Sequence, residues 1–115
     1  MFTDQELKVL HYQMWDYIAD TILEEKRVIN IYYTKRKFLE DKVIDKLEVF
    51  CECFMCQYVK QHYSLNELDP CKYCPSALNV SLFRGCLSGL YSLCKDACDY
   101  RTQLILALAI RDSWR

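Results

Sequence analysis

Four cysteines in two CxxC pairs are the residues of this chain best suited to chemistry. Cys53 and Cys56 form the first pair, and Cys71 and Cys74 form the second, which is followed directly by Pro75. Thiolates are preferred zinc ligands, and a CxxC spacing lets two sulfurs from one turn reach the same ion. The spacing therefore predicts one Zn²⁺ in a tetrahedral cage formed by these four cysteines.

A cage of four thiolates has no open coordination position for water or substrate. Sites of this kind are structural, whereas catalytic zinc keeps an exchangeable ligand. We therefore expect structural Zn²⁺, at about one or two ions per chain. Three alternatives stay open for the same cysteines: an iron–sulfur cluster, a disulfide framework, or thiols packed in the core.

Cys86 is the main rival for a place in the ligand set, because it follows the second CxxC pair closely. Cys51 is too near the first pair to bind the same ion comfortably. Cys94 and Cys98 are four residues apart on one predicted helix face and are expected in the core, although a second metal site with Cys51 and Cys86 stays open. His62 is an alternative ligand, but a solvated or capping role is more typical of such a histidine.

Other catalytic chemistry has little support in the sequence. Nucleophilic catalysis needs a base beside the nucleophile, and the two histidines, His11 and His62, lie in no recognisable arrangement of that kind. Gly85 and Gly89 are the only glycines, so a glycine-rich phosphate loop is excluded. We expect a protein that is not an enzyme, and no small-molecule substrate is indicated.

Charge is unevenly distributed along a chain whose net charge is only −1. Residues 1–25 carry a net charge of −5, and residues 26–46 carry +4. Within the basic segment, Lys35, Arg36 and Lys37 stand among aromatic residues, and such side chains can neutralise phosphates and stack on bases. This cluster is the best candidate for nucleic-acid binding; a solvated helix face is the plainer interpretation.

The apolar periodicity predicts a mainly α protein. Thr3 and Glu6 form a capping box that opens the first helix, and the segment 28–33 is compatible with either an extended stretch or a bent helix. The sequence is scarce in glycine and proline, which argues against an all-β fold. The expected helices cover residues 4–27, 38–50, 54–63, 87–94 and 96–111.

The chain length of 115 residues indicates one domain, 1–115, with a cysteine-rich metal-binding section over 51–86. We expect a small helical bundle with a zinc-stapled CxxC…CxxC knuckle, in which the apolar segment 104–110 is central. The first residues resemble no signal peptide, and no apolar run is long enough to span a bilayer. A soluble, cytoplasmic protein without membrane partners is expected.

Five short motifs run through most of the chain in a defined order. They are His11-x3-Trp15-x2-Ile18-Ala19, Cys53-x2-Cys56-Gln57-Tyr58, Cys71-x2-Cys74-Pro75, Cys86-Leu87-x-Gly89-Leu90-Tyr91 and Ile110-Arg111-Asp112. In this pattern the chain resembles a group of small proteins of unknown function encoded by bacteriophages and prophages. It departs from the group in having Tyr17 where a second tryptophan often stands, and in its additional Cys51, Cys94 and Cys98.

The resemblance implies a role in the cytoplasm of an infected bacterium, with the two CxxC pairs as zinc-type residues and Cys86 as a recurrent fifth cysteine. It supplies no established activity. With the lack of catalytic groups and the segregated charge, it leads us to expect a phage-encoded factor that binds and inhibits or redirects a host protein, such as a defence or transcription component. The alternatives are a zinc-stabilised nucleic-acid-binding protein and a virion or assembly component.

Overall fold

The computed structural model describes residues 2–44, 53–62 and 90–114, and every regular element within these ranges is a helix. The mainly α prediction is therefore confirmed. The predicted knuckle falls largely on residues outside the described ranges. The helices are α1 (Asp4–Glu25), α2 (Ile31–Asp41), α3 (Phe54–His62), α5 (Leu90–Lys95) and α6 (Tyr100–Arg111).

Helix α1 begins and ends through local backbone chemistry. The Thr3 hydroxyl accepts a hydrogen bond from the Glu6 N–H at 3.1 Å, and the Glu6 carboxylate accepts one from the Thr3 N–H at 2.9 Å, which confirms the capping box. At the other end Lys26 adopts a left-handed conformation with φ 53°, and its N–H bonds to the Ile22 carbonyl. This conformation ends the helix without a glycine or a proline.

The ambiguous segment 28–33 proves to be partly extended and partly helical. The Asn30 side chain accepts a hydrogen bond from the Tyr33 N–H at 3.0 Å, so Asn30 is the N-cap of α2. The second helix therefore begins at Ile31, earlier than the apolar period from Phe38 indicated. Helix α2 ends at Asp41 and residues 42–44 are not helical, with Val43 at φ 56°, so the predicted 38–50 helix is wrong there. Residues 45–50 of that prediction lie outside the described ranges.

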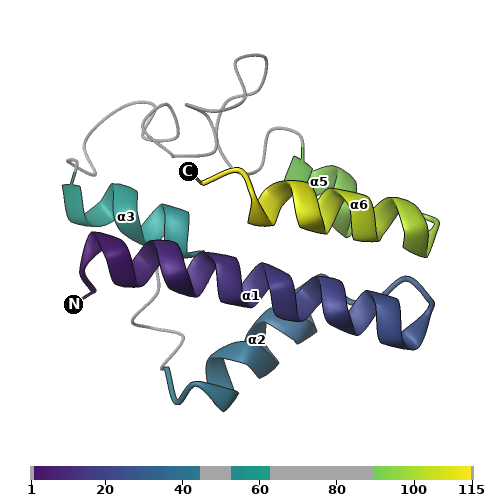
Figure 1. Cartoon of the computed structure of the whole chain (residues 1–115), viewed down its shortest axis with the longest axis horizontal. Coiled ribbons are helices and arrows are strands. Elements are labelled where there is room, and N and C mark those ends of the chain that lie inside the picture. The colour runs from purple at the N-terminus through teal and green to yellow at the C-terminus, as the bar shows by residue number, and fades with distance from the viewer. Residues whose placement is uncertain (1, 45–52, 63–89, 115) are drawn as a thin grey trace.

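The helices pack around α1, which contacts α6, α3 and α2 (Figure 1). Helices α1 and α6 lie side by side and run in opposite directions, and α5 packs against α6. The segment 104–110 packs against α1 with Ala107 and Ile110 in the core, but it is not buried all round as expected. Its Ile105 side chain is 66% exposed, so an apolar run that looked continuous has a solvent-facing side.

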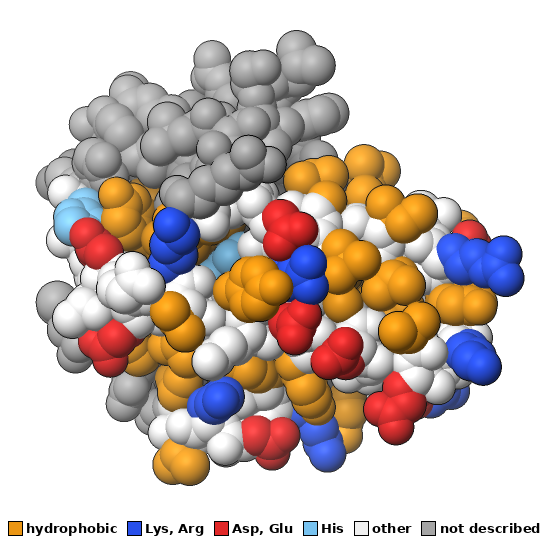
Figure 2. Space-filling model, viewed as in Figure 1, with side chains coloured by type: hydrophobic (Ala, Val, Ile, Leu, Met, Phe, Trp, Pro, Cys, Tyr) orange, Lys and Arg blue, Asp and Glu red, His pale blue; other side chains and the backbone are white. Residues whose placement is uncertain are grey.

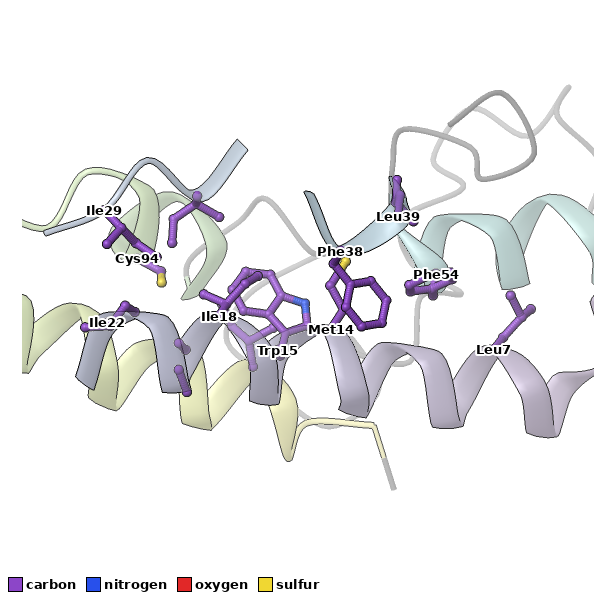
Figure 3. Packing of buried hydrophobic residues seen from close by; sticks show 14 residues of the cluster. Leu7, Met14, Trp15, Ile18, Ile22, Ile29, Phe38, Leu39, Phe54 and Cys94 are labelled. Carbon is purple, nitrogen blue, oxygen red and sulfur yellow. The ribbon is translucent and has the colours of Figure 1, made fainter. Parts of the chain in front are cut away.

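The core consists of apolar side chains that α1 presents to the surrounding helices (Figure 3). Phe38 of α2 and Phe54 of α3 meet edge to face at 6.4 Å between ring centroids, which joins two helices that both cross α1. Burying one such side chain contributes about 1.5–3 kcal/mol. The α1 members of this core are Leu7, Met14, Trp15, Ile18, Ala19 and Ile22.

One fully buried polar side chain, Gln103, connects three parts of the fold. Its amide oxygen accepts a hydrogen bond from the Ile29 N–H at 2.9 Å, and its amide nitrogen donates to the carbonyls of Ile29 and Cys94, both at 3.1 Å. Gln103 therefore ties the α1–α2 linker and the end of α5 to the first turn of α6. The sequence analysis did not single this residue out.

Candidate functional site

The first CxxC pair lies at the N-terminus of α3. The Cys53 carbonyl accepts a hydrogen bond from the Gln57 N–H at 3.0 Å, which places Cys53 at the start of the helix and Cys56 in its first turn. Both cysteines are half-buried, next to the fully buried Phe54 and Met55. The positive end of a helix stabilises thiolates, the form that binds metal. The donor chemistry of this pair fits zinc.

The remaining predicted ligands, Cys71, Cys74 and Cys86, lie outside the described residues, as does Cys51. Among residues 2–44, 53–62 and 90–114, no three His, Cys, Asp or Glu side chains gather closely enough to hold a metal ion. The four-cysteine zinc site therefore stays a prediction. Two of its four ligands, Cys53 and Cys56, have a described position.

Cys94 and Cys98 have different chemical environments. Cys94 is fully buried, its thiol points to the Gln103 carbonyl at 3.6 Å, and burial raises the pKa of this thiol to about 12. Cys94 is therefore a neutral core thiol at neutral pH, as expected. The expectation of a core position is wrong for Cys98, which is exposed because it lies in the turn between α5 and α6, with its sulfur 3.9 Å from the Asp96 carbonyl oxygen. These environments give no support to a shared second metal site.

The two histidines differ as sharply. His62 is partly exposed at the end of α3, where its Nε2 pairs with the Asp4 carboxylate in the first turn of α1. This is the solvated, capping role that the sequence favoured. His11 is buried, and because a carbonyl can only accept, its Nε2 donates to the Ile110 carbonyl at 2.8 Å. The other ring nitrogen, Nδ1, is buried and has no hydrogen-bond partner among the residues that the structure describes.

His11 is expected to make the stability of the fold dependent on pH. Burial is the largest effect and lowers its pKa below the usual 6.5; Lys35 acts in the same direction, while the Ile110 carbonyl and Cys53 oppose it. The folded state thus holds neutral His11, whereas the unfolded chain takes up a proton below about pH 6.5. Stability present above that pH is lost as the pH falls through the lowered pKa of the folded protein, by up to about 1.4 kcal/mol per pH unit for one proton.

Urea unfolding of wild type and His11→Gln between about pH 7.5 and 5 measures this dependence. The glutamine amide can still donate to the Ile110 carbonyl but does not titrate, so a shallower pH dependence is expected. His62→Gln removes an exposed histidine and is the matched control. Equal slopes in wild type and His11→Gln would show that His11 is not the group responsible.

Residues of the first, fourth and last of the five motifs contact one another in the described part of the chain. His11 bonds to Ile110, which brings the first motif to the last. The Trp15 and Tyr91 rings meet edge to face at 6.1 Å. The Arg111 guanidinium donates to the Asp16 carboxylate at 2.8 Å, with both residues part-buried. The pattern residues therefore have packing roles that hold α1, α5 and α6 together.

The predicted basic cluster is divided between interior and surface. Lys35 is only 4% exposed, and its ammonium lies over the rings of Tyr91 and Trp15, at 4.7 and 5.9 Å from their centroids. Arg36 lies over the exposed Tyr32 ring at 4.9 Å, and Lys37 is exposed. Lys35 thus contributes to the core, whereas Arg36 and Lys37 can reach a ligand from solvent.

Comparison with known proteins found no matching family model, no matching curated protein and no matching solved structure. No helix in the described part of the chain is both long and apolar enough to cross a membrane.

Proposed function

We propose that this protein is a non-catalytic, zinc-stabilised domain that binds a partner protein through the outer face of α1 and α6. The phage-type resemblance supports a host bacterial protein as that partner, with inhibition or redirection of a defence or transcription component as the outcome. Four thiolates from Cys53, Cys56, Cys71 and Cys74, with Cys86 as the rival ligand, would give zinc a structural role in this proposal.

An exposed apolar face over the two longest helices carries the proposal. Tyr12 and Leu23 of α1 are 48% and 55% exposed, and Ile105 of α6 is 66% exposed. Figure 2 shows hydrophobic side chains gathered over α1 and α6, with carboxylates among them. The Arg111 guanidinium lies over the Tyr12 ring at 4.8 Å, so this face combines exposed apolar side chains with charged ones. Exposed apolar side chains gathered on one face are favoured at interaction sites. We call the surface of Tyr12, Leu23 and Ile105 the α1–α6 face.

The charges beside this face indicate the chemistry of the partner. Asp20 and Glu24 are exposed on α1 next to Leu23, and neither forms an ion pair with a described residue. Asp16 is instead held by Arg111. A partner surface that combines apolar and basic side chains would bury the apolar residues and pair with the two available carboxylates. An amphipathic basic helix is the simplest such surface.

The surroundings of two side chains, His11 and Cys94, support a non-catalytic role. The buried His11 directs its Nε2 to a backbone carbonyl, which removes that nitrogen from proton transfer. The buried Cys94 thiol has a pKa of about 12, so it holds its proton at neutral pH and is a poor nucleophile.

Leu23→Glu combined with Ile105→Glu is expected to abolish partner binding, because both substitutions place charge in the apolar face. Buried interface anchors typically contribute about 2 kcal/mol or more, so the affinity should fall by at least about thirtyfold. The measurement is affinity capture from bacterial host extract with quantitative mass spectrometry. Both residues are exposed, so the fold should be kept.

Val43→Glu is the matched control, since Val43 is 92% exposed and follows α2. A stoichiometric protein that is retained by wild type and Val43→Glu but lost in the double variant supports the proposal. Recovery of no stoichiometric protein, or equal recovery with all three proteins, would refute it.

Nucleic-acid binding is the second candidate, because exposed aromatic and basic side chains adjoin on α2. Residues 26–37 contain five basic and no acidic residues. Tyr32 and Tyr33 are 49% and 60% exposed, and Arg36 lies over the Tyr32 ring. Binding of this type weakens steeply with salt. Because Lys35 is buried, Arg36→Ala and Lys37→Ala test the surface without disturbing the core.

A further inference from the structure

We propose that a cavity between α1 and α2 binds a nucleotide through its phosphate and its base. The inference is independent of the α1–α6 face, and it deepens the nucleic-acid candidate by naming a site. The cavity has a volume of about 360 Å³, within the range of about 300–1,000 Å³ typical of small-molecule sites.

The cavity exists because the chain turns back at the end of α1. Figure 1 shows α2 returning beneath α1 after the linker that begins at Lys26. Walls come from the last turns of α1, from the linker, and from the first two turns of α2. The Tyr17 ring of α1 contacts the Phe38 ring of α2 at 6.0 Å, which fixes the two helices beside the cavity.

Several polar groups that line the cavity keep unused hydrogen-bonding capacity. The hydroxyls of Thr21 and Thr34 each donate to a backbone carbonyl at 2.8 Å, so their oxygens remain as acceptors. The Asn30 amide oxygen accepts the cap hydrogen bond from Tyr33, which leaves its NH₂ group as a donor. Such convergent donors and acceptors suit a ligand with hydroxyl and oxyanion groups.

The charges of the cavity favour an anion. Arg27 pairs with Glu25 at 2.9 Å, so these two charges compensate each other. Lys37 lines the same cavity, is exposed, and forms no hydrogen bond or ion pair with a described residue. Its ammonium is therefore the available cation, and an ammonium binds phosphate as a compact charge.

Two tyrosine rings complete the recognition. Tyr17 and Tyr33 both line the cavity, and Tyr33 is 60% exposed. Bases stack on aromatic rings of this kind, and the stacking tolerates any base. A nucleotide, free or within a single strand, carries both a base that stacks and a phosphate that pairs with an ammonium.

Titration with AMP, followed by NMR, tests the cavity directly. Adenosine and inorganic phosphate each lack one of the two recognised parts and should bind at least about tenfold more weakly than AMP. Lys37→Gln should weaken AMP binding at least about tenfold, because it removes the charge that pairs with the phosphate. Lys95→Gln makes the same charge change outside the cavity and should leave binding unchanged.

A 5′-phosphorylated tetranucleotide distinguishes the two sources. Tighter, salt-dependent binding of the tetranucleotide than of AMP assigns the site to a strand; tighter binding of AMP assigns it to a free nucleotide. Val28→Trp, which fills the cavity from the linker, should abolish binding of either. No AMP binding, or binding that survives both Lys37→Gln and Val28→Trp, would overturn the inference.

Different results would exclude the cavity as a nucleotide site and exclude nucleic-acid binding altogether. If the tetranucleotide binds wild type and Val28→Trp equally but does not bind Arg36→Ala, nucleic acid binds at the Tyr32 surface and the cavity is excluded as the site. If neither AMP nor the tetranucleotide binds, both are excluded.

Discussion

Replacing Gln103 with leucine is expected to destabilise the fold by about 3–5 kcal/mol, among the largest effects of a single substitution. Leucine removes three hydrogen bonds and leaves the Ile29 N–H and carbonyl without partners among the described residues, while the Cys94 carbonyl keeps only a long hydrogen bond from the Ala97 N–H at 3.5 Å. Each unsatisfied buried group costs about 1–3 kcal/mol. Because small domains are stable by only about 5–15 kcal/mol, most of the margin would be lost.

Thermal and urea unfolding measure this effect, with a fall in melting temperature of about 10–20 °C expected. Gln13→Leu is the matched control, because Gln13 is exposed on α1 and the same substitution there should change stability by less than about 0.5 kcal/mol. A Gln103→Leu protein as stable as the control would show that the three hydrogen bonds do not hold the linker, α5 and α6 together.

Cys56→Ser is expected to release the predicted Zn²⁺, because a serine hydroxyl does not replace a thiolate in a four-sulfur cage. Structural zinc contributes on the order of 10–16 kcal/mol of apparent binding free energy in small peptides. Loss of the metal should therefore also unfold the cysteine-rich section 51–86. Cys71→Ser, at the second CxxC pair, should have the same effect on metal content and helicity.

Elemental analysis and circular dichroism of the purified variants test the ligand set. Cys98→Ser is the matched control, since Cys98 is an exposed thiol near the Asp96 carbonyl and is not a member of the predicted ligand set. Full zinc content and native helicity in both Cys56→Ser and Cys71→Ser would show the ligand set to be wrong. Iron and acid-labile sulfide in place of zinc would assign the cysteines to a cluster.

Local signals in the sequence predicted most of the helices. The capping box fixed the start of α1, and the apolar period gave α3 within one residue at its end. The end of α1 was less visible, because Lys26 adopts a left-handed conformation that usually calls for glycine or asparagine. Asn30 was the missed signal, since an asparagine before an apolar run is a typical N-cap.

Sequence periodicity did not distinguish buried from exposed polar residues. Lys35 looked like a surface cation but is buried against Trp15 and Tyr91, and Gln103 looked unremarkable but is fully buried. Both placements depend on contacts between helices that are distant in sequence. The CxxC spacing identified Cys53 and Cys56 as candidate zinc ligands. The α1–α6 face could not be predicted in this way, because it depends on how two helices pack.

Footprinting of the isolated complex by hydroxyl radicals tests the central claim, that the α1–α6 face binds the partner. Aromatic and aliphatic side chains react when exposed, so the assay reads Tyr12, Leu23 and Ile105 directly. We predict that these three side chains become protected in the complex, while Tyr32 and Tyr33 keep their reactivity. Protection of Tyr32 and Tyr33 with an unprotected α1–α6 face would contradict it.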